Sequence, residues 1–290
     1  MMSSRWFQIV SLSSVFIVSA CVGEPDDADE SDPGADGTVV HIMPMTTPEK
    51  VVDAAPAGAR LTNFGGPTLT HVNVHPVFWN ANTQFQANIN AFYKGVTNST
   101  LFDLLNQYSQ IGRGTAVNGF VDNRTTTRVS DAAIHTELNR LFAAGSLPAP
   151  TASTYFPVHF PAGVTITGPD GNRSCQVFCA YHGTYVRNGV NVNYGVIPDQ
   201  GGNCAGGCGR NPQRVNNMDS VASHELVEAV TDPAVGLATV FGPPLAWYDM
   251  TNGEIGDICN GQQGTTVGGD GVTYTIQLEF SNSANNCVAR

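Results

Sequence analysis

Apart from Cys21, the chain has six cysteines, and they constrain its fold more than any other feature. They are Cys175, Cys179, Cys204, Cys208, Cys259 and Cys287. An even number of cysteines in an exported chain favours disulfides, and the local spacing predicts the pairs Cys175–Cys179, Cys204–Cys208 and Cys259–Cys287. The two C-x3-C pairs are alternatively zinc ligands, which an oxidising compartment disfavours. The last bridge would fasten the C-terminal strand to the segment that ends at Cys259.

The N-terminus has the pattern of an export signal. Arg5 precedes an uncharged, mostly apolar stretch from Trp6 to Ala20, which is too short to span a bilayer comfortably. The run Val18-Ser19-Ala20-Cys21 resembles a bacterial lipobox, in which the cysteine becomes the lipidated first residue; the alternative is an ordinary secretory signal with an incidental cysteine. We therefore predict a lipoprotein signal peptide at 1–20 and lipidation at Cys21. The protein is then a bacterial cell-surface or outer-membrane lipoprotein, or secreted, and contacts membrane through its lipid anchor only.

The segment that follows the signal is strongly acidic. Residues 23–37 contain seven acidic residues and no large apolar side chain, so they supply most of the net charge of −11. Such a composition cannot form a core and predicts a disordered tether, which we place at residues 21–60 together with the lipidated cysteine. Lysine and arginine are few and scattered, so we expect no nucleic-acid partner.

Apolar spacing predicts both helices and strands in residues 61–290. Helical spacing marks 85–96, 101–108 and a helix that starts near Ser130. Alternating apolar residues mark strands at 70–80, 155–160, 190–198 and 272–280. Helices first, strands next and then one more helix predict a single α+β (mixed α/β) domain, which we expect to be a monomer.

Residues 218–231, MDSVASHELVEAVT, predict that last helix. At helical spacing His224 and Glu228 lie one turn apart on one face, with Glu225 on the flank. In the H-E-x-x-H motif of zinc proteases, two histidines hold the metal and the glutamate beside the first activates the bound water. Here Glu228 takes the second ligand position, and a carboxylate is also a zinc ligand. The alternative is an ordinary capped helix with acidic surface residues.

Two acids downstream complete a candidate metal site. Residues 252–259, NGEIGDIC, carry Glu254 and Asp257 three positions apart, and so on one face of a helix. The stretch from Ser223 to Asp257 resembles the paired active-site helices of thermolysin-like zincins. HEL at 224–226 and AVTD at 229–232 fit, with E-x-x-D at 254–257 where the second helix belongs. The departure is Glu228 in place of histidine, because a second carboxylate should acidify a metal-bound water less.

This resemblance implies a zincin-like domain with a twisted sheet and an active-site helix. It implies that His224, Glu228 and Glu254 bind zinc, or another divalent ion, because carboxylates are hard ligands. Glu225 is then the general base, and Asp257 holds His224 through the other ring nitrogen.

Four further side chains are candidates for the site. His182 in FCAYHG is an extra ligand or a transition-state donor, or a hydrogen-bonded structural histidine. Tyr248 in AWYD is a catalytic donor to an oxyanion, with simple packing as the alternative. His71 and His75 share one face of the strand at 70–80, as metal ligands or as polar surface.

A second resemblance involves SHELVEAVTDP, AWYD, EIGDIC and an N-terminal strand with a Phe-Trp pair. These segments are similar to the phosphate-induced, EXORDIUM-like secreted proteins of plants and their bacterial relatives. The likeness implies export and no established reaction. Two hypotheses therefore stand. The protein is a surface-anchored zinc metallopeptidase with a peptide or protein substrate, or it is a non-catalytic extracellular binding or signalling protein with a structural or vestigial metal site.

Overall fold

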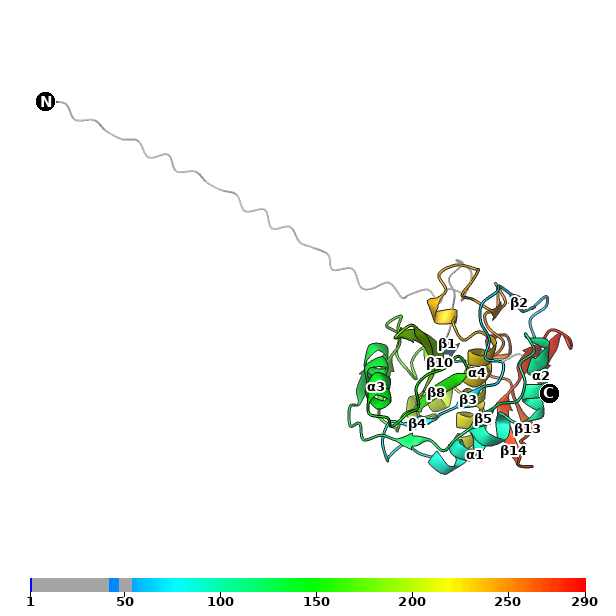
Figure 1. Cartoon of the computed structure of the whole chain (residues 1–290), viewed down its shortest axis with the longest axis horizontal. Coiled ribbons are helices and arrows are strands. Elements are labelled where there is room, and N and C mark those ends of the chain that lie inside the picture. Colours follow the sequence, from blue (N-terminus) through cyan, green and yellow to red (C-terminus); the bar gives the residue numbers. More distant parts are fainter. Residues whose placement is uncertain (2–41, 47–53) are drawn as a thin grey trace. The chain divides into compact units, whose positions relative to one another are not determined.

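The computed structural model describes Met1, residues 42–46 and residues 54–290 (Figure 1). The predicted signal peptide after Met1, the lipidation site Cys21 and the acidic run 23–37 lie outside the described residues. The described residues 42–46 and 54–290 belong to one compact unit. Within the described part of the chain, no helix is both long and apolar enough to cross a bilayer.

A mixed sheet forms the framework of the domain. Its strands are β1 (Ile42–Pro44), β3 (Asn73–Val74), β4 (Val77–Phe78), β5 (Thr115–Ala116), β6 (Phe120–Val121), β8 (Thr154–His159), β10 (Phe178–Arg187) and β11 (Val190–Ile197). The order is β1-β10-β11-β8-β3-β5, with β4 between β8 and β6. The pairs from β11 to β5 are parallel, whereas β10 runs antiparallel to β11 and to β1. The sheet therefore starts earlier than expected, because β1 lies in the segment that we assigned to the tether.

Helices cover both faces of this sheet. They are α1 (Gln86–Val96), α2 (Thr100–Leu104), α3 (Asp131–Ala143) and α4 (Arg214–Thr231). One apolar core lies between α3 and the face that carries Phe156 and Val158. The larger core lies on the opposite face, where α1 and α4 pack, and Figure 1 shows α3 and α4 on opposite sides of β8. On its other side α4 packs against β14 (Thr273–Gln277), so it is central to the domain.

Short elements complete the fold. The paired strands are β2 (Thr62–Asn63) with β12 (Trp247–Tyr248), β7 (Arg128–Ser130) with β9 (Thr165–Thr167), β13 (Gln263–Val267) with β14, and β15 (Glu279–Ser281) with β16 (Asn286–Val288). The 3-10 turns are η1 (Leu105–Gln107), η2 (Gly202–Gly206), η3 (Val235–Leu237) and η4 (Asp257–Cys259).

The mixed α+β class is confirmed, and so are the helices that the apolar spacing predicts. Ser99 and Ser130 cap α2 and α3, since their side chains accept main-chain N–H groups of the first turn. Two predicted strands are interrupted. The strand at 70–80 breaks at Pro76, between the end of β3 at Val74 and the start of β4 at Val77, because proline has no N–H for the ladder. The strand at 272–280 divides at Leu278 into β14 and β15, which pair with different partners.

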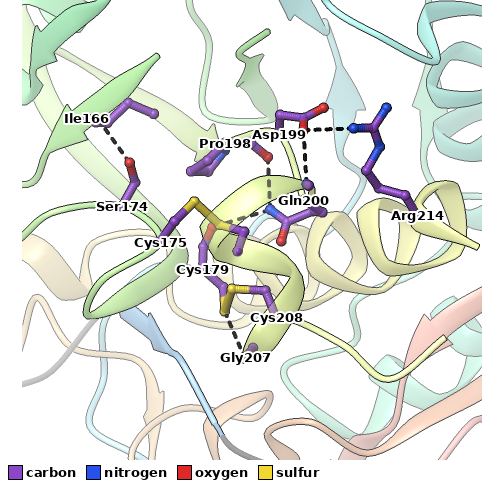
Figure 2. Close-up of a disulfide and its surroundings, with 12 residues drawn as sticks. Ile166, Ser174, Cys175, Cys179, Pro198, Asp199, Gln200, Gly207, Cys208 and Arg214 are labelled. Atoms are coloured by element: carbon purple, nitrogen blue, oxygen red, sulfur yellow. Dashed lines mark hydrogen bonds and ion pairs between the residues drawn. A yellow bond between two sulfur atoms is a disulfide. The ribbon is translucent and has the colours of Figure 1, made fainter. Parts of the chain in front are cut away.

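All six cysteines of the folded part form disulfides, but two predicted pairs are wrong. The bridges are Cys175–Cys204, Cys179–Cys208 and Cys259–Cys287. Figure 2 shows the first two beside Gln200, whose Nε2 donates to the main-chain oxygens of Pro198 and Cys179. Cys179 lies in an extended strand, which carries it away from Cys175. The turn of η2 instead brings Cys204 and Cys208 together, and each faces one cysteine near β10. The Cys259–Cys287 bridge is confirmed.

Candidate metal centre

The centre is built on α4, a buried helix that carries ionisable side chains. Every residue from Asn217 to Thr231 is buried. A helix buried on all sides is normally apolar all round. Yet α4 buries His224, Glu225 and Glu228, each at most 1% exposed. The predicted helix is confirmed, although it begins at Arg214, and the alternative of surface acids is wrong.

His182 reaches this cluster from β10, and it contacts carboxylates with both ring nitrogens. Its Nδ1 lies 3.5 Å from Glu225 Oε2 and 3.6 Å from Glu228 Oε2. Its Nε2 lies 3.6 Å from Glu254 Oε1 and 3.3 Å from the main-chain oxygen of Asp232. A tertiary contact across β10 and α4 thus brings a second histidine to the cluster.

Glu254 and Asp257 come from a tight turn and not from the second helix that the zincin resemblance implies. The segment forms only η4, because two glycines interrupt it. Gly253 adopts φ +87°, a conformation that other residues rarely adopt. At Gly256, an added Cβ would lie 2.6 Å from His224 Nδ1 and 2.9 Å from Glu228 Oε1. Glycine at these positions lets the turn close directly over the α4 residues.

The carboxylates of the centre lack ordinary partners. Among the described residues, neither oxygen of Glu225, Glu254 or Glu279 has a hydrogen-bond partner, and neither have Glu228 Oε2 and Asp257 Oδ1. Within the same part of the chain, each ion pair recorded for these acids is with a histidine. Buried polar atoms without partners are rare in proteins and call for water, protons or an ion.

The residues fit a divalent cation. One ligand atom from each of His182, Glu228 and Glu254 lies within 4.8 Å of the others, and the same holds for His224, Glu228 and Asp257. Two ligands of a tetrahedral ion, each about 2.1 Å from it, are about 3.4 Å apart. Glu228 Oε2 lies 3.6 Å from His182 Nδ1 and Glu254 Oε1 lies 3.6 Å from His182 Nε2, each close to that value. One ion binds one ring nitrogen, so the second carboxylate has to reach it across the wider limit of 4.8 Å. The predicted set of His224, Glu228 and Glu254 is thus divided between two groups that share Glu228.

Burial and mutual repulsion control protonation here. Burial raises the pKa of Glu254 well above its usual value, and Glu228 raises it further. Burial also opposes charge on Glu228, but His224 and His182 outweigh it and lower that pKa to about 2. Burial lowers the pKa of His182, whereas Glu225 and Glu228 raise it to a net value of about 10. Protons thus balance the cluster, and a cation would have to displace them.

Gln277 takes the place that we predicted for Asp257. Its Nε2 lies 2.7 Å from His224 Nδ1. Asp257 lies on the other side of the ring, with Oδ1 3.9 Å from Nε2. Its Oδ2 instead accepts the main-chain N–H of Glu254 over 3.1 Å and so closes the turn. The expected contact of Asp257 with the second ring nitrogen is therefore wrong.

Gln277 and Glu279 are the residues that sequence reasoning missed. Gln277 ends β14, which packs against α4, and Glu279 begins β15; both side chains are fully buried. Burial raises the pKa of Glu279 well above its usual value, and His224 lowers it only partly. In the sequence, the alternation of the strand at 272–280 places both residues on the face opposite to Ile276 and Phe280, and this was the signal that could have identified them. That pattern alone is equally typical of a solvent-facing side.

Other predicted residues lie elsewhere. Tyr248 is buried in β12 within an apolar cluster with Val235 and Leu245, and its role as an oxyanion donor stays a prediction. His71 is exposed, and its Nδ1 contacts the main-chain oxygen of Arg113, while His75 stacks on Phe156. Neither belongs to a candidate metal group among the described residues.

No protein-family model, curated protein or solved structure matches this chain.

Proposed function

We propose that this protein is an exported metalloprotein that holds a divalent transition metal in a closed centre, with His182, Glu228 and Glu254 as ligands. The observation that carries the proposal is the complete burial of Glu254 with no hydrogen-bond partner for either oxygen among the described residues. Ionised, such a carboxylate is expensive to bury unless a cation accompanies it. Imidazole together with carboxylates suits zinc first, and manganese or iron as alternatives.

The closure of the centre supports a structural role for the metal. Its candidate ligands are at most 1% exposed, whereas catalytic zinc sites keep an open position for water. The three ligands come from β10, α4 and the turn before η4, which are far apart in the chain. A shared ion would cross-link these elements, as the disulfides do elsewhere. This role agrees with an extracellular binding or signalling protein.

Glu225 supports a second candidate, a metal-dependent hydrolase acting on peptides. It follows His224 as the general base follows the first histidine in zinc proteases. Its carboxylate is 3.5 Å from His182, and burial raises its pKa, as suits a group that exchanges protons. The Asp257 side chain, 10% exposed, is the most exposed member of the cluster among the described residues. Substrate would have to reach the centre from this side.

Metal analysis tests the proposal. The full chain, purified with its disulfides oxidised, should contain one transition-metal ion, which Glu254→Gln loses. His71→Gln, at an exposed histidine, is the matched control and should keep it. A wild-type protein without a stoichiometric ion after incubation with zinc would refute the proposal. Cleavage of a peptide library that disappears in Glu225→Gln would favour the hydrolase over the structural role.

A further inference from the structure

The amide of Gln277 is oriented by hydrogen bonds at both of its ends. Its Nε2 donates to the main-chain oxygen of Gly256 over 2.8 Å, and its Oε1 accepts the main-chain N–H of Gly261 over 3.4 Å. The opposite orientation would set oxygen against oxygen at Gly256 and N–H against N–H at Gly261. The backbone is held too, because the Gln277 N–H donates to Ser223 Oγ. Gln277 therefore presents its NH2 group, which can only donate, to His224.

This orientation decides which nitrogen of His224 carries a proton. Nδ1 lies 2.7 Å from Gln277 Nε2, so Nδ1 has to accept and carries no proton. Because Nδ1 accepts this bond, the single proton of a neutral ring is on Nε2. Nε2 lies 3.1 Å from Glu228 Oε1, within hydrogen-bonding distance. A protonated Nε2 has no lone pair for a metal ion.

The two oxygens of Glu228 have different surroundings. Oε1 faces His224 Nε2 and also accepts the main-chain N–H of Asp257 over 3.1 Å. Oε2 has no hydrogen-bond partner among the described residues and lies 3.6 Å from His182 Nδ1. With two donors on Oε1, Oε2 is the oxygen of Glu228 that remains available to a cation.

We propose that His224 is a positioning residue, which donates to Glu228 Oε1 and so aims Oε2 at the metal, and that His182 supplies the imidazole ligand. The inference rests on the proposed metal-binding function and assigns roles within the same centre. It reverses the roles that the spacing of the H-E-x-x-E motif implies for the two histidines. It also gives Gln277 a function, since Gln277 sets the tautomer on which the donation depends.

Nuclear magnetic resonance of the full chain tests this assignment without reference to activity. The protein, with nitrogen-15 in its histidines, is loaded with cadmium-113. We expect a cadmium–nitrogen coupling on one ring nitrogen of His182 and none on His224, whose Nε2 should appear protonated. Signals are assigned with His182→Gln, His224→Gln and the exposed control His71→Gln.

The variants also separate a donor from a ligand. His182→Gln should lose the bound ion. His224→Gln should keep it to within about tenfold in affinity, because the glutamine amide can still donate to Glu228. His224→Ala, which removes the donor, should bind the ion about 10–100-fold more weakly.

A cadmium coupling on His224, or a His224→Gln variant that loses the ion as fully as His182→Gln, would overturn the inference. A wild-type chain that binds no cadmium would refute the metal-binding function and the inference together. Bound cadmium coupled to His224 would refute the inference alone. If a variant fails to fold, the histidine signals are assigned through the backbone resonances of the wild-type chain, so the wild-type spectrum still decides between these results.

Discussion

Beside α3, two acids and two arginines lie together at the edge of the domain. Arg140 contacts Asp122 over 2.9 Å and also Glu137, and Arg124 lies 3.5 Å and 3.3 Å from the same two acids. Charge is therefore balanced within the chain. The centre on α4 also gathers carboxylates, but its recorded ion pairs within the described residues are all with histidines. The negative charge of the acids beside α3 is neutralised by arginines of the same chain. The negative charge of the acids on α4 has to be neutralised by protons or by a bound cation.

Removal of metal should have the largest effect, and only at the centre on α4. A metal ion present at a thousand times its dissociation constant stabilises the folded state by about 4 kcal/mol. For a chain of this size a chelator should therefore lower the unfolding midpoint by about 10 °C. Thermal unfolding with zinc and with chelator measures this shift, and Glu254→Gln should abolish it. Equal midpoints in wild type under both conditions would show that protons alone balance the centre.

Gly256→Ala should weaken the metal centre without touching a ligand. The new Cβ would collide with His224 and Glu228, so the turn has to move away from α4. We expect a loss of metal affinity of about 10–100-fold, as when second-shell support of a metal ligand is removed. Gly242→Ala is the control, because no atom lies within 4 Å of its added Cβ. Equal affinities in a zinc titration would show that the turn does not support the ligands.

Arg140→Met breaks the balanced region. Asp122 and Glu137 are then left with Arg124 alone, and Asp122 is buried. Because the Arg140 side chain is 43% exposed, solvent screens part of the loss, and we expect a cost of about 1–2 kcal/mol. Urea unfolding measures this cost, with exposed Arg128→Met as the control. The cost should be the same with zinc and with chelator, and a difference would mean that the two regions are coupled.

Asp219→Asn concerns an acid of α4 that remains protonated. Burial raises the pKa of Asp219 to about 8, so the unfolded chain ionises first and stability falls as pH rises from about 4 to about 8. Asparagine does not ionise, although its buried amide still needs partners. Relative to wild type, the variant should gain several kcal/mol of stability between pH 3 and pH 8, because each unit of pKa difference corresponds to about 1.4 kcal/mol. Urea unfolding at both pH values measures it, and an equal difference at both would contradict a buried neutral Asp219.

The spacing within α4 was predictable because helical periodicity is local. His224, Glu225 and Glu228 are brought together by 3.6 residues per turn, whatever surrounds the helix. The same local logic predicts the helix that starts near Ser130. It fails where two segments meet. The C-x3-C pairs bond across to each other because β10 is extended and η2 is tightly turned, and no local spacing contains that information.

The composition of the centre depended on three-dimensional contacts. His182 is 42 positions before His224 and reaches the acids of α4 only because β10 packs against α4. Gln277 arrives from the opposite side on β14, and its amide determines what His224 can do. The motif alone therefore predicts an acidic site on a helix with a histidine at its start. Which histidine faces the acids as a ligand depends on a proton position, and that is set by hydrogen bonds between segments far apart in the chain.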